Sequence, residues 1–376
     1  MNLSFWERET WFNEIDFAIV GSGIVGLTCA LSLRNRFPNS KIVIFERGLL
    51  PNGASTKNAG FACFGSVSEI LDDLKSHSEE AVIELVRKRV FGLKLLREIL
   101  GDHTIDYQEN GGYELFPLND EALFEECMEK LEGVNNLLKE TIFNGKSPFL
   151  IKNDPFSFKN IRKQVIFNQF EGQLDTGKMM QSLIQKCLKS NIFILNSFKI
   201  ESYLPKNNQI QLNFVNFGEI YTQKLLIATN GFANDLISKE NIVPARAQVL
   251  ITSPIENASI KGTFHLDRGY YYFRNVGNRI LLGGGRNLDF SGETTTQMQV
   301  TQHIQEQLEA LLRTTILPNK TFTIEQRWSG IMGVGNQKSP IVKELTRNVY
   351  CGVRLGGMGV AIGSLVGKEL ADLASL

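Results

Sequence analysis

The chain has 376 residues, of which 43% are hydrophobic and 21% are charged. At about 150 residues per domain this length predicts two or three domains, and the composition excludes a disordered, collagen-like or disulfide-stapled chain. Forty Lys and Arg balance forty Asp and Glu, so no nucleic-acid partner is expected. The five scattered cysteines form no C-x-x-C pair, and the sequence therefore predicts neither a disulfide framework nor a metal site.

Neither end of the sequence predicts export or a membrane span. Glu7, Arg8 and Glu9 lie where a signal peptide needs an apolar run. Residues 355–367 are uncharged but rich in glycine, and this stretch is shorter than the roughly 20 apolar residues that cross a bilayer. We expect a cytoplasmic protein.

The first elements predict a βαβ unit. Residues 16–20 form an apolar strand, residues 24–36 have helical spacing, and residues 41–45 form a second strand that ends at Glu46. The glycines of G-S-G-I-V-G at 21–26 allow a tight turn and a close approach of backbone N–H groups to a pyrophosphate. Glu46 follows Gly26 by about 20 residues, a spacing at which a carboxylate accepts ribose hydroxyls. This pattern predicts a site for NAD or FAD.

The later elements alternate between helix and strand patterns. Residues 144–158 contain two prolines and are expected to form a loop, and residues 243–286 are rich in strands with a hairpin turn at Gly277-Asn278. Helices are expected at 69–100, 121–138, 176–189 (capped by Asp175 or Thr176), 295–313 and 360–373, and strands at 108–116, 224–228, 322–334 and 348–353.

Several further motifs follow in order: GASTKNAG at 53–60, ATNG at 228–231, PARAQ at 244–248, YYYFR at 270–274 and GGMGVAIGSLVGKELA at 356–371. With the first glycine motif they resemble the FAD-dependent D-amino acid oxidase superfamily, in the branch of glycine oxidase, sarcosine oxidase and gamma-glutamylputrescine oxidoreductase. The resemblance implies an α/β chain. A Rossmann-like FAD-binding domain would comprise residues 1–85, 165–240 and 330–376, and a mostly antiparallel α+β substrate domain would comprise 86–164 and 241–329.

The resemblance also implies which residues hold noncovalent FAD. The first glycines would contact the pyrophosphate, Glu46 the adenosine ribose, and the turn at 356–360 the flavin, where N–H groups and a helix dipole favour negative charge. The full expected set is Gly21, Gly23, Ile24, Val25, Gly26, Glu46, Arg47, Ser55, Thr56, Lys57, Asn58, Ala59, Gly60, Ala228, Thr229, Gly231, Gly356, Gly357, Met358, Gly359 and Val360.

Three positions depart from the resemblance. Met332 stands where amino acid oxidases of this superfamily place an arginine that binds the substrate carboxylate. Gly330 stands where sarcosine oxidases have the cysteine that tethers flavin, and Leu281 where they have a lysine that helps activate oxygen. A simple α-amino acid substrate is therefore not favoured, and oxygen or another electron acceptor is left open.

Tyr270, Tyr272 and Arg274 are the candidate catalytic residues because alternate strand positions share a face. The tyrosines would orient an amine, and Arg274 would replace the missing clamp or bind a main-chain carbonyl. Ordinary strand packing is the competing interpretation for the tyrosines. Of the four histidines, His265 is the candidate to face the pocket, because it lies on the strand that leads to the tyrosines, and spacing alone supports no more than that. Cys63 is a candidate to lie near the flavin, with a buried packing thiol as the favoured interpretation.

The resulting hypothesis is an FAD-dependent oxidoreductase that oxidises a C–N bond of a small-molecule amine or N-substituted amino acid. A hydride would pass from the carbon next to nitrogen to flavin N5, after which the imine is hydrolysed. One alternative is a dehydrogenase that passes electrons to a quinone or carrier. Another is a non-catalytic FAD-binding assembly or scaffold protein, which the methionine at position 332 keeps open.

Overall fold

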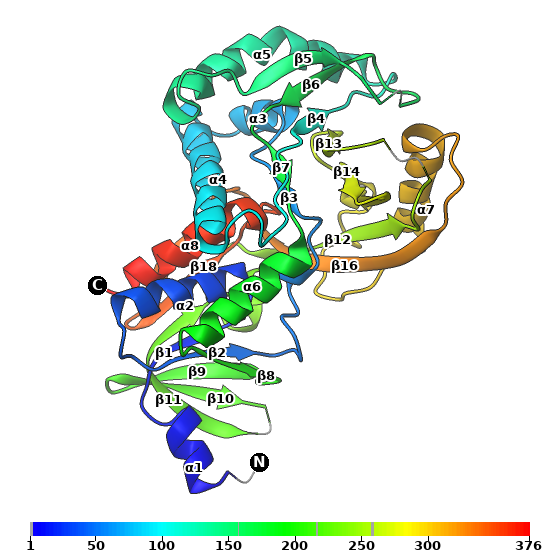
Figure 1. Cartoon of the computed structure of the whole chain (residues 1–376). Helices are drawn as coiled ribbons and strands as arrows, with labels where there is room; N and C mark the ends of the chain where they lie inside the picture. Colours follow the sequence, from blue (N-terminus) through cyan, green and yellow to red (C-terminus); the bar gives the residue numbers. More distant parts are fainter. Residues whose placement is uncertain (1–2, 157, 216, 257–258) are drawn as a thin grey trace.

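The computed structural model describes residues 3–156, 158–215, 217–256 and 259–376, which form two large sheets with helices packed around them (Figure 1). The first sheet is eight-stranded and has a parallel centre. Its order is β17 (Ile341–Thr346), β18 (Val349–Val353), β11 (Gly218–Ile227), β1 (Ile15–Val20), β2 (Ile42–Glu46) and β8 (Phe193–Asn196), and β10 (Gln209–Phe214) and β9 (Ile200–Lys206) continue from β11.

The predicted βαβ unit is confirmed, because α2 (Ile24–Arg36) connects the parallel strands β1 and β2. Gly21 has φ +99°, a backbone conformation that favours glycine. A Cβ at Gly26 would lie 1.9 Å from the Gly21 carbonyl oxygen. Only glycine therefore lets α2 begin this close to the end of β1.

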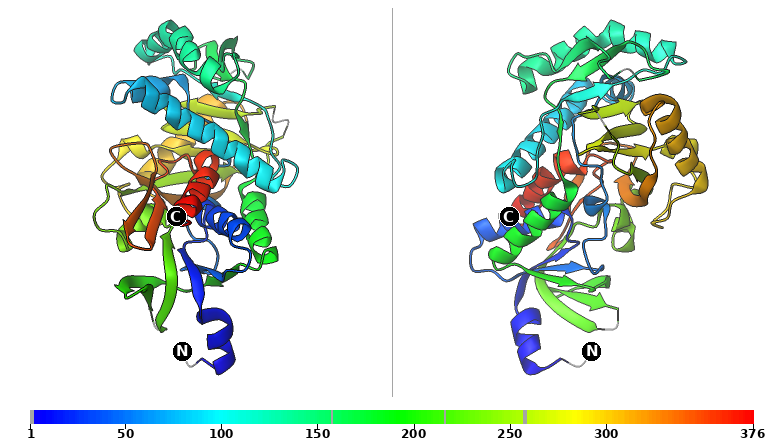
Figure 2. Two further views of the ribbon diagram at one scale, coloured as in Figure 1. Left: turned by 90° about the vertical axis from the view of Figure 1, so that its left-hand side faces the viewer. Right: turned by 45° about the vertical axis from the view of Figure 1, so that its right-hand side comes forward.

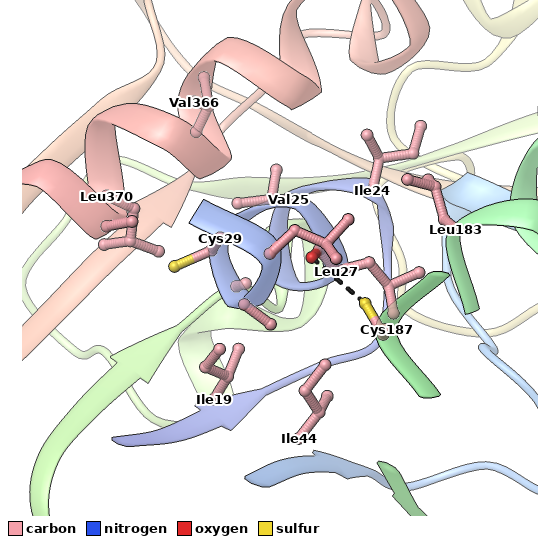
Figure 3. Packing of buried hydrophobic residues seen from close by; sticks show 14 of the residues in the cluster. Ile19, Ile24, Val25, Leu27, Cys29, Ile44, Leu183, Cys187, Val366 and Leu370 are labelled. Atoms are coloured by element: carbon pink, nitrogen blue, oxygen red, sulfur yellow. Dashed lines mark hydrogen bonds between the residues drawn. The ribbon is translucent and has the colours of Figure 1, made fainter. Parts of the chain in front are cut away.

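Three helices cover one face of the first sheet, as Figure 3 shows from close by: α2, α6 (Thr176–Lys189) and α8 (Gly359–Leu373). Val25 and Leu27 of α2 are buried between them, and the Cys187 thiol lies 3.5 Å from the Leu27 carbonyl oxygen. A Cβ at Gly367 would lie 2.1 Å from Thr28 Oγ1. Small residues thus bring α8 against α2, although the two helices are more than 300 residues apart in the sequence.

The second sheet is also eight-stranded, and it is antiparallel except where β13 meets β4. Its order is β16 (Ile324–Val334), β12 (Val243–Thr252), β15 (Arg279–Gly284), β14 (Tyr271–Val276), β13 (Thr263–Leu266), β4 (Gly112–Glu114), β6 (Gln164–Asn168) and β5 (Phe149–Asn153), and a separate pair contains β3 (Phe61–Ala62) and β7 (Gly172–Gln173). The Rossmann-like and antiparallel halves of the predicted fold class are therefore confirmed.

Several predicted elements have different bounds. The loop expected at 144–158 contains the edge strand β5, whose residues after Phe149 are exposed, so the sequence shows no alternating apolar pattern there. The helix expected at 69–100 is two helices, α3 (Val67–Leu74) and α4 (Glu79–Leu100), because Ser66 and Ser78 each cap a separate helix start. The helix expected from residue 295 begins at Gln302, as α7 (Gln302–Leu311).

Helix α4 runs from the region of α3 and α5 to α8, and α5 (Glu121–Ile142) lies above α4 (Figures 1 and 2). At the contact, a Cβ on Gly92 would lie 2.3 Å from the Ala361 carbonyl oxygen. The two helix backbones therefore touch directly at Gly92.

The two sheets are built from alternating segments of the chain. Strand β6 belongs to the second sheet, although it falls almost entirely within residues 165–240, which were assigned to the first domain. The division into two discontinuous domains otherwise stays a prediction. In the described part of the chain, no helix combines the length and hydropathy needed to cross a membrane.

Candidate cofactor and substrate site

A cavity of about 640 Å³ lies between the two sheets. One wall is formed where β1, β2 and β11 end, at Val20, Phe45 and Ala228. The opposite wall includes Ala247 of β12 and Gly330 of β16. The crevice outside the carboxyl ends of parallel strands is where open α/β sheets bind ligands.

The cavity brings together most of the residues expected at the cofactor site. Four of the expected residues lie outside its described lining: Gly26, Thr56, Gly60 and Gly231. The lining includes Gly21, Gly23, Ile24, Val25, Glu46, Arg47, Ser55, Lys57, Asn58, Ala59, Ala228, Thr229, Gly356, Gly357, Met358, Gly359 and Val360.

Glu46 fixes one end of the cavity. Its Oε2 accepts hydrogen bonds from Ser22 N–H at 3.1 Å and Ser22 Oγ at 2.8 Å, and its Oε1 accepts one from Gly48 N–H at 2.9 Å. These three donors hold a carboxylate that is only 5% exposed. Beside it, the Arg47 guanidinium lies 3.6 Å from the centre of the Phe232 ring. The end is suited to a hydroxyl-bearing, aromatic group.

The first glycine turn forms a narrow part of the cavity. Ser55 Oγ accepts the Ile24 N–H at 3.0 Å, and a Cβ at Gly23 would lie 2.8 Å from the same oxygen. The start of α2 presents N–H groups and the positive end of its dipole here. The backbone thus forms a cradle that a side chain at position 23 would fill, and N–H groups at a helix start are suited to a phosphate.

The other end of the cavity is the turn before α8. Gly356 and Gly357 have φ of +60° and +86°. At the start of α8 the N–H groups of Ala361 and Ile362 donate to the Met358 carbonyl oxygen, so those of Gly359 and Val360 are the first-turn donors without an acceptor in the described helix. Asn230 Oδ1 accepts the N–H groups of Arg354 and Leu355, each at 3.1 Å, and so holds this turn. Sequence reasoning missed Asn230, although it is part of the ATNG motif.

Met332 borders the same turn. A Cβ at Gly357 would lie 3.2 Å from the Met332 sulfur, so the thioether packs beside the glycine turn. The position where the family resemblance would place a carboxylate-binding arginine is therefore apolar.

The three candidate catalytic residues separate into two groups. Tyr270 and Tyr272 line the cavity, and burial raises the pKa of Tyr272 to about 12, so its hydroxyl stays protonated at neutral pH. Arg274 is not among the described lining residues. Its guanidinium donates to the carbonyl oxygens of Ala59, Asn275 and Leu174, the last two at 3.0 Å. Two roles were expected for Arg274, and these contacts match the one in which it binds main-chain carbonyl groups.

A buried acidic cluster that the sequence did not indicate adjoins the cavity. Burial raises the pKa of Glu114 to about 7 and that of Glu171 to about 8. Burial also opposes ionisation of Glu69, but the charges of His265, Lys338 and Arg89 and the Ser66 N–H outweigh it and lower the Glu69 pKa. Glu69 and His265 both line the cavity.

His265 Nε2 lies 3.8 Å from Glu171 Oε2. Burial lowers the pKa of the imidazole, and the charge of Glu69 opposes that shift. Within the described residues, no three His, Cys, Asp or Glu side chains are grouped to hold a metal ion. Two further cations that sequence reasoning missed, Arg268 and Arg286, line the cavity near Tyr270.

Comparisons with known proteins agree with this architecture. The profile of the family described as FAD dependent oxidoreductase (DAO) matches residues 16–373. Gamma-glutamylputrescine oxidoreductase of Escherichia coli (strain K12) is 23% identical over 379 residues, covering 95% of this chain and 83% of that protein.

Two solved structures share the fold at low sequence identity. Glycine oxidase from Geobacillus kaustophilus has a TM-score of 0.76 at 18% identity, covering 96% of this chain and 94% of that one. L-proline dehydrogenase from P. horikoshii has a TM-score of 0.74 at 18% identity, covering 96% and 93%.

Proposed function

Because the chain belongs to the DAO family of FAD-dependent oxidoreductases, we propose that it oxidises the C–N bond of an amine or N-substituted amino acid. The observation that carries the proposal is the single cavity that connects the Glu46 carboxylate, the cradle at Gly23 and the turn before α8 to a pocket lined by Tyr270 and Tyr272.

These residues fit FAD. Glu46 would accept ribose hydroxyls, the N–H groups at the start of α2 would bind the pyrophosphate, and the start of α8 would face the flavin. FAD bound in this way supplies an acceptor for the hydride of the carbon next to the substrate nitrogen. The remaining members of the expected set, among them Thr56 and Gly60, would shape the loop beside it.

The protein's own residues would orient the amine and keep it neutral. The hydroxyls of Tyr270 and Tyr272 would hydrogen-bond to substrate, and the apolar walls would favour the unprotonated amine. Arg274 would act as a positioning residue because it holds the Ala59 carbonyl in the cofactor loop. Released imine would be hydrolysed by water.

The cysteines support noncovalent attachment. Cys63 lines the cavity, but burial raises its pKa well above the ordinary value, which disfavours the nucleophilic thiolate. Position 330 is a glycine on β16, where a Cβ would lie 3.1 Å from Lys57 Cβ. Denaturation should therefore release all the flavin into the supernatant.

Purified protein tests the proposal directly. We expect a yellow protein whose flavin bleaches anaerobically with secondary amines or N-substituted amino acids and yields a carbonyl product after imine hydrolysis. Oxygen consumption during turnover then distinguishes an oxidase from a dehydrogenase. Flavin that stays oxidised across a broad panel would favour the scaffold alternative, and colourless protein that cannot be reconstituted with FAD would contradict the cofactor assignment.

A further inference from the structure

We infer that Arg286 binds a carboxylate of the substrate, so that the substrate is an amine that carries a carboxylate. The inference deepens the proposed function and rests on it. Arg286 follows β15, on the side of the cavity formed by β14 and β15. Met332 lies on a different strand, β16.

The backbone fixes Arg286 at the edge of the cavity. It follows Gly284 and Gly285, which have φ of +122° and +78°, and it begins a short 3-10 turn, Arg286–Leu288. The Gly285 N–H donates to the Tyr270 carbonyl oxygen at 2.9 Å. Arg286 and Tyr270 are therefore held side by side, and both line the cavity.

The guanidinium of Arg286 lacks a protein acceptor. Its Nε is buried without a hydrogen-bond partner among the described residues, and no carboxylate of the described chain forms an ion pair with it. Its nearest stabilising contact is the Phe290 ring, whose centre lies 5.0 Å from Cζ. Arg286 as a whole is partly buried, but a buried N–H group without an acceptor is unfavourable, and native proteins pair such groups.

The other arginines of the lining are already engaged. Arg89 donates to the Phe64 carbonyl oxygen at 2.7 Å, Arg268 lies 3.5 Å from an Asp267 carboxylate oxygen, and Arg47 lies 3.9 Å from one of Asp235. Arg286 is thus the arginine of the described lining that is available for a ligand.

A carboxylate matches this group in shape and charge. The planar guanidinium donates two parallel hydrogen bonds to a carboxylate, which a point charge cannot reproduce. The Tyr270 hydroxyl lies on the same part of the lining and supplies a further donor.

Binding of benzoate and of its uncharged analogue benzamide to the FAD-loaded protein tests the inference without turnover. By calorimetry, wild type should prefer benzoate, Arg286→Met should lose that preference by about tenfold or more, and Arg286→Lys should keep part of it. The matched control is Arg279→Met, at the start of β15, because Arg279 pairs with Glu325 at 2.9 Å and is not in the described lining. This control should bind like wild type.

A wild type that does not bind benzoate more tightly than benzamide, or a preference that survives in Arg286→Met, would overturn the inference. Flavin reduction separates this failure from failure of the proposed function. N-benzylglycine and N-methylbenzylamine differ by a carboxylate. If both reduce the flavin equally well, the proposed function holds and the inference fails. If benzoate preference depends on Arg286 while no amine reduces the flavin, the inference about carboxylate binding holds and the proposed function fails.

Discussion

Asn230 Oδ1 accepts the main-chain N–H of Leu355 at 3.1 Å, and so joins the end of the first sheet to the turn before α8. The same oxygen accepts the Arg354 N–H, and Asn230 itself has φ +45°, a conformation that asparagine tolerates better than most residues. One side chain therefore sets the position of the turn that we assign to the flavin.

We expect Asn230→Ala to weaken FAD binding by about 1–3 kcal/mol, because two N–H groups lose their acceptor and the turn loosens. Fluorescence of released flavin measures the dissociation constant. The control is Asn213→Ala, which removes an exposed hydrogen bond to Ser202 on the outer strands of the same sheet. Unchanged FAD affinity in Asn230→Ala would contradict the role given to this residue.

Glu46→Gln should weaken FAD retention by about 1.5–3 kcal/mol, since a neutral amide replaces the charged acceptor of the ribose hydroxyls. Equilibrium dialysis against FAD measures the change. Ser22→Ala is the control because it removes one donor to Glu46 and leaves the carboxylate in place. If the two variants lose affinity equally, the carboxylate itself is not what the cofactor contacts.

The stability of the protein should fall as pH rises from about 5 to 8. Burial raises the pKa of Glu171 to about 8 from an ordinary value of 4.5, with Glu69 and Glu114 adding to the rise and the Phe64 and Gly65 N–H groups opposing it. The folded state therefore binds more protons than the unfolded state in this range, and raising the pH favours unfolding.

Glu171→Gln should remove much of this dependence. The free energy of unfolding of Glu171→Gln minus that of wild type should rise by roughly 2–4 kcal/mol between pH 5.5 and pH 8.5. Urea titrations at the two pH values would measure this difference. The control is Glu121→Gln, an exposed carboxylate on α5 that pairs with Arg162 at 3.2 Å. Parallel pH profiles for wild type and Glu171→Gln would show that the carboxyl is ionised normally.

Two helix glycines should respond oppositely to alanine. Gly92→Ala should destabilise the protein by about 1–3 kcal/mol, because its Cβ would meet the Ala361 carbonyl oxygen at 2.3 Å. Gly133→Ala on α5 should stabilise it by about 0.5–1 kcal/mol, since nothing lies within 4 Å of the added Cβ. Thermal unfolding of both variants, with bound FAD measured in each, tests the direct contact between α4 and α8.

The sequence was most informative where backbone geometry dictates the residue. Gly21, Gly23 and Gly26 have no room for a side chain, and that requirement is visible as a motif. Boundaries were less predictable because a serine cap, as at Ser78, divides what periodicity reads as one helix. Edge strand β5 takes its register from β6 rather than from its own pattern.

The substrate side of the site was predicted only in part. The tyrosine strand was found from its motif and alternation, but Arg286 has no local pattern. The Ser66-x-x-Glu69 capping pattern and the ATNG motif at 228–231 do not indicate that Glu69 and Asn230 line this cavity. Their significance arises from their surroundings in the fold. Arg286 Nε has no hydrogen-bond partner among the described residues, Glu69 caps α3 beside His265, and Asn230 accepts two N–H groups from a distant turn. Residue spacing along the chain contains no record of such contacts.

Residues near 23 form the cradle that we assign to phosphate, and residues near 357, at the other end of the sequence, form the opposite end of the cavity. During synthesis, the first wall emerges from the ribosome long before the second exists. Capture of the cofactor must therefore be a late event, and nascent chains that stop short of α8 should depend on chaperones rather than on FAD for protection.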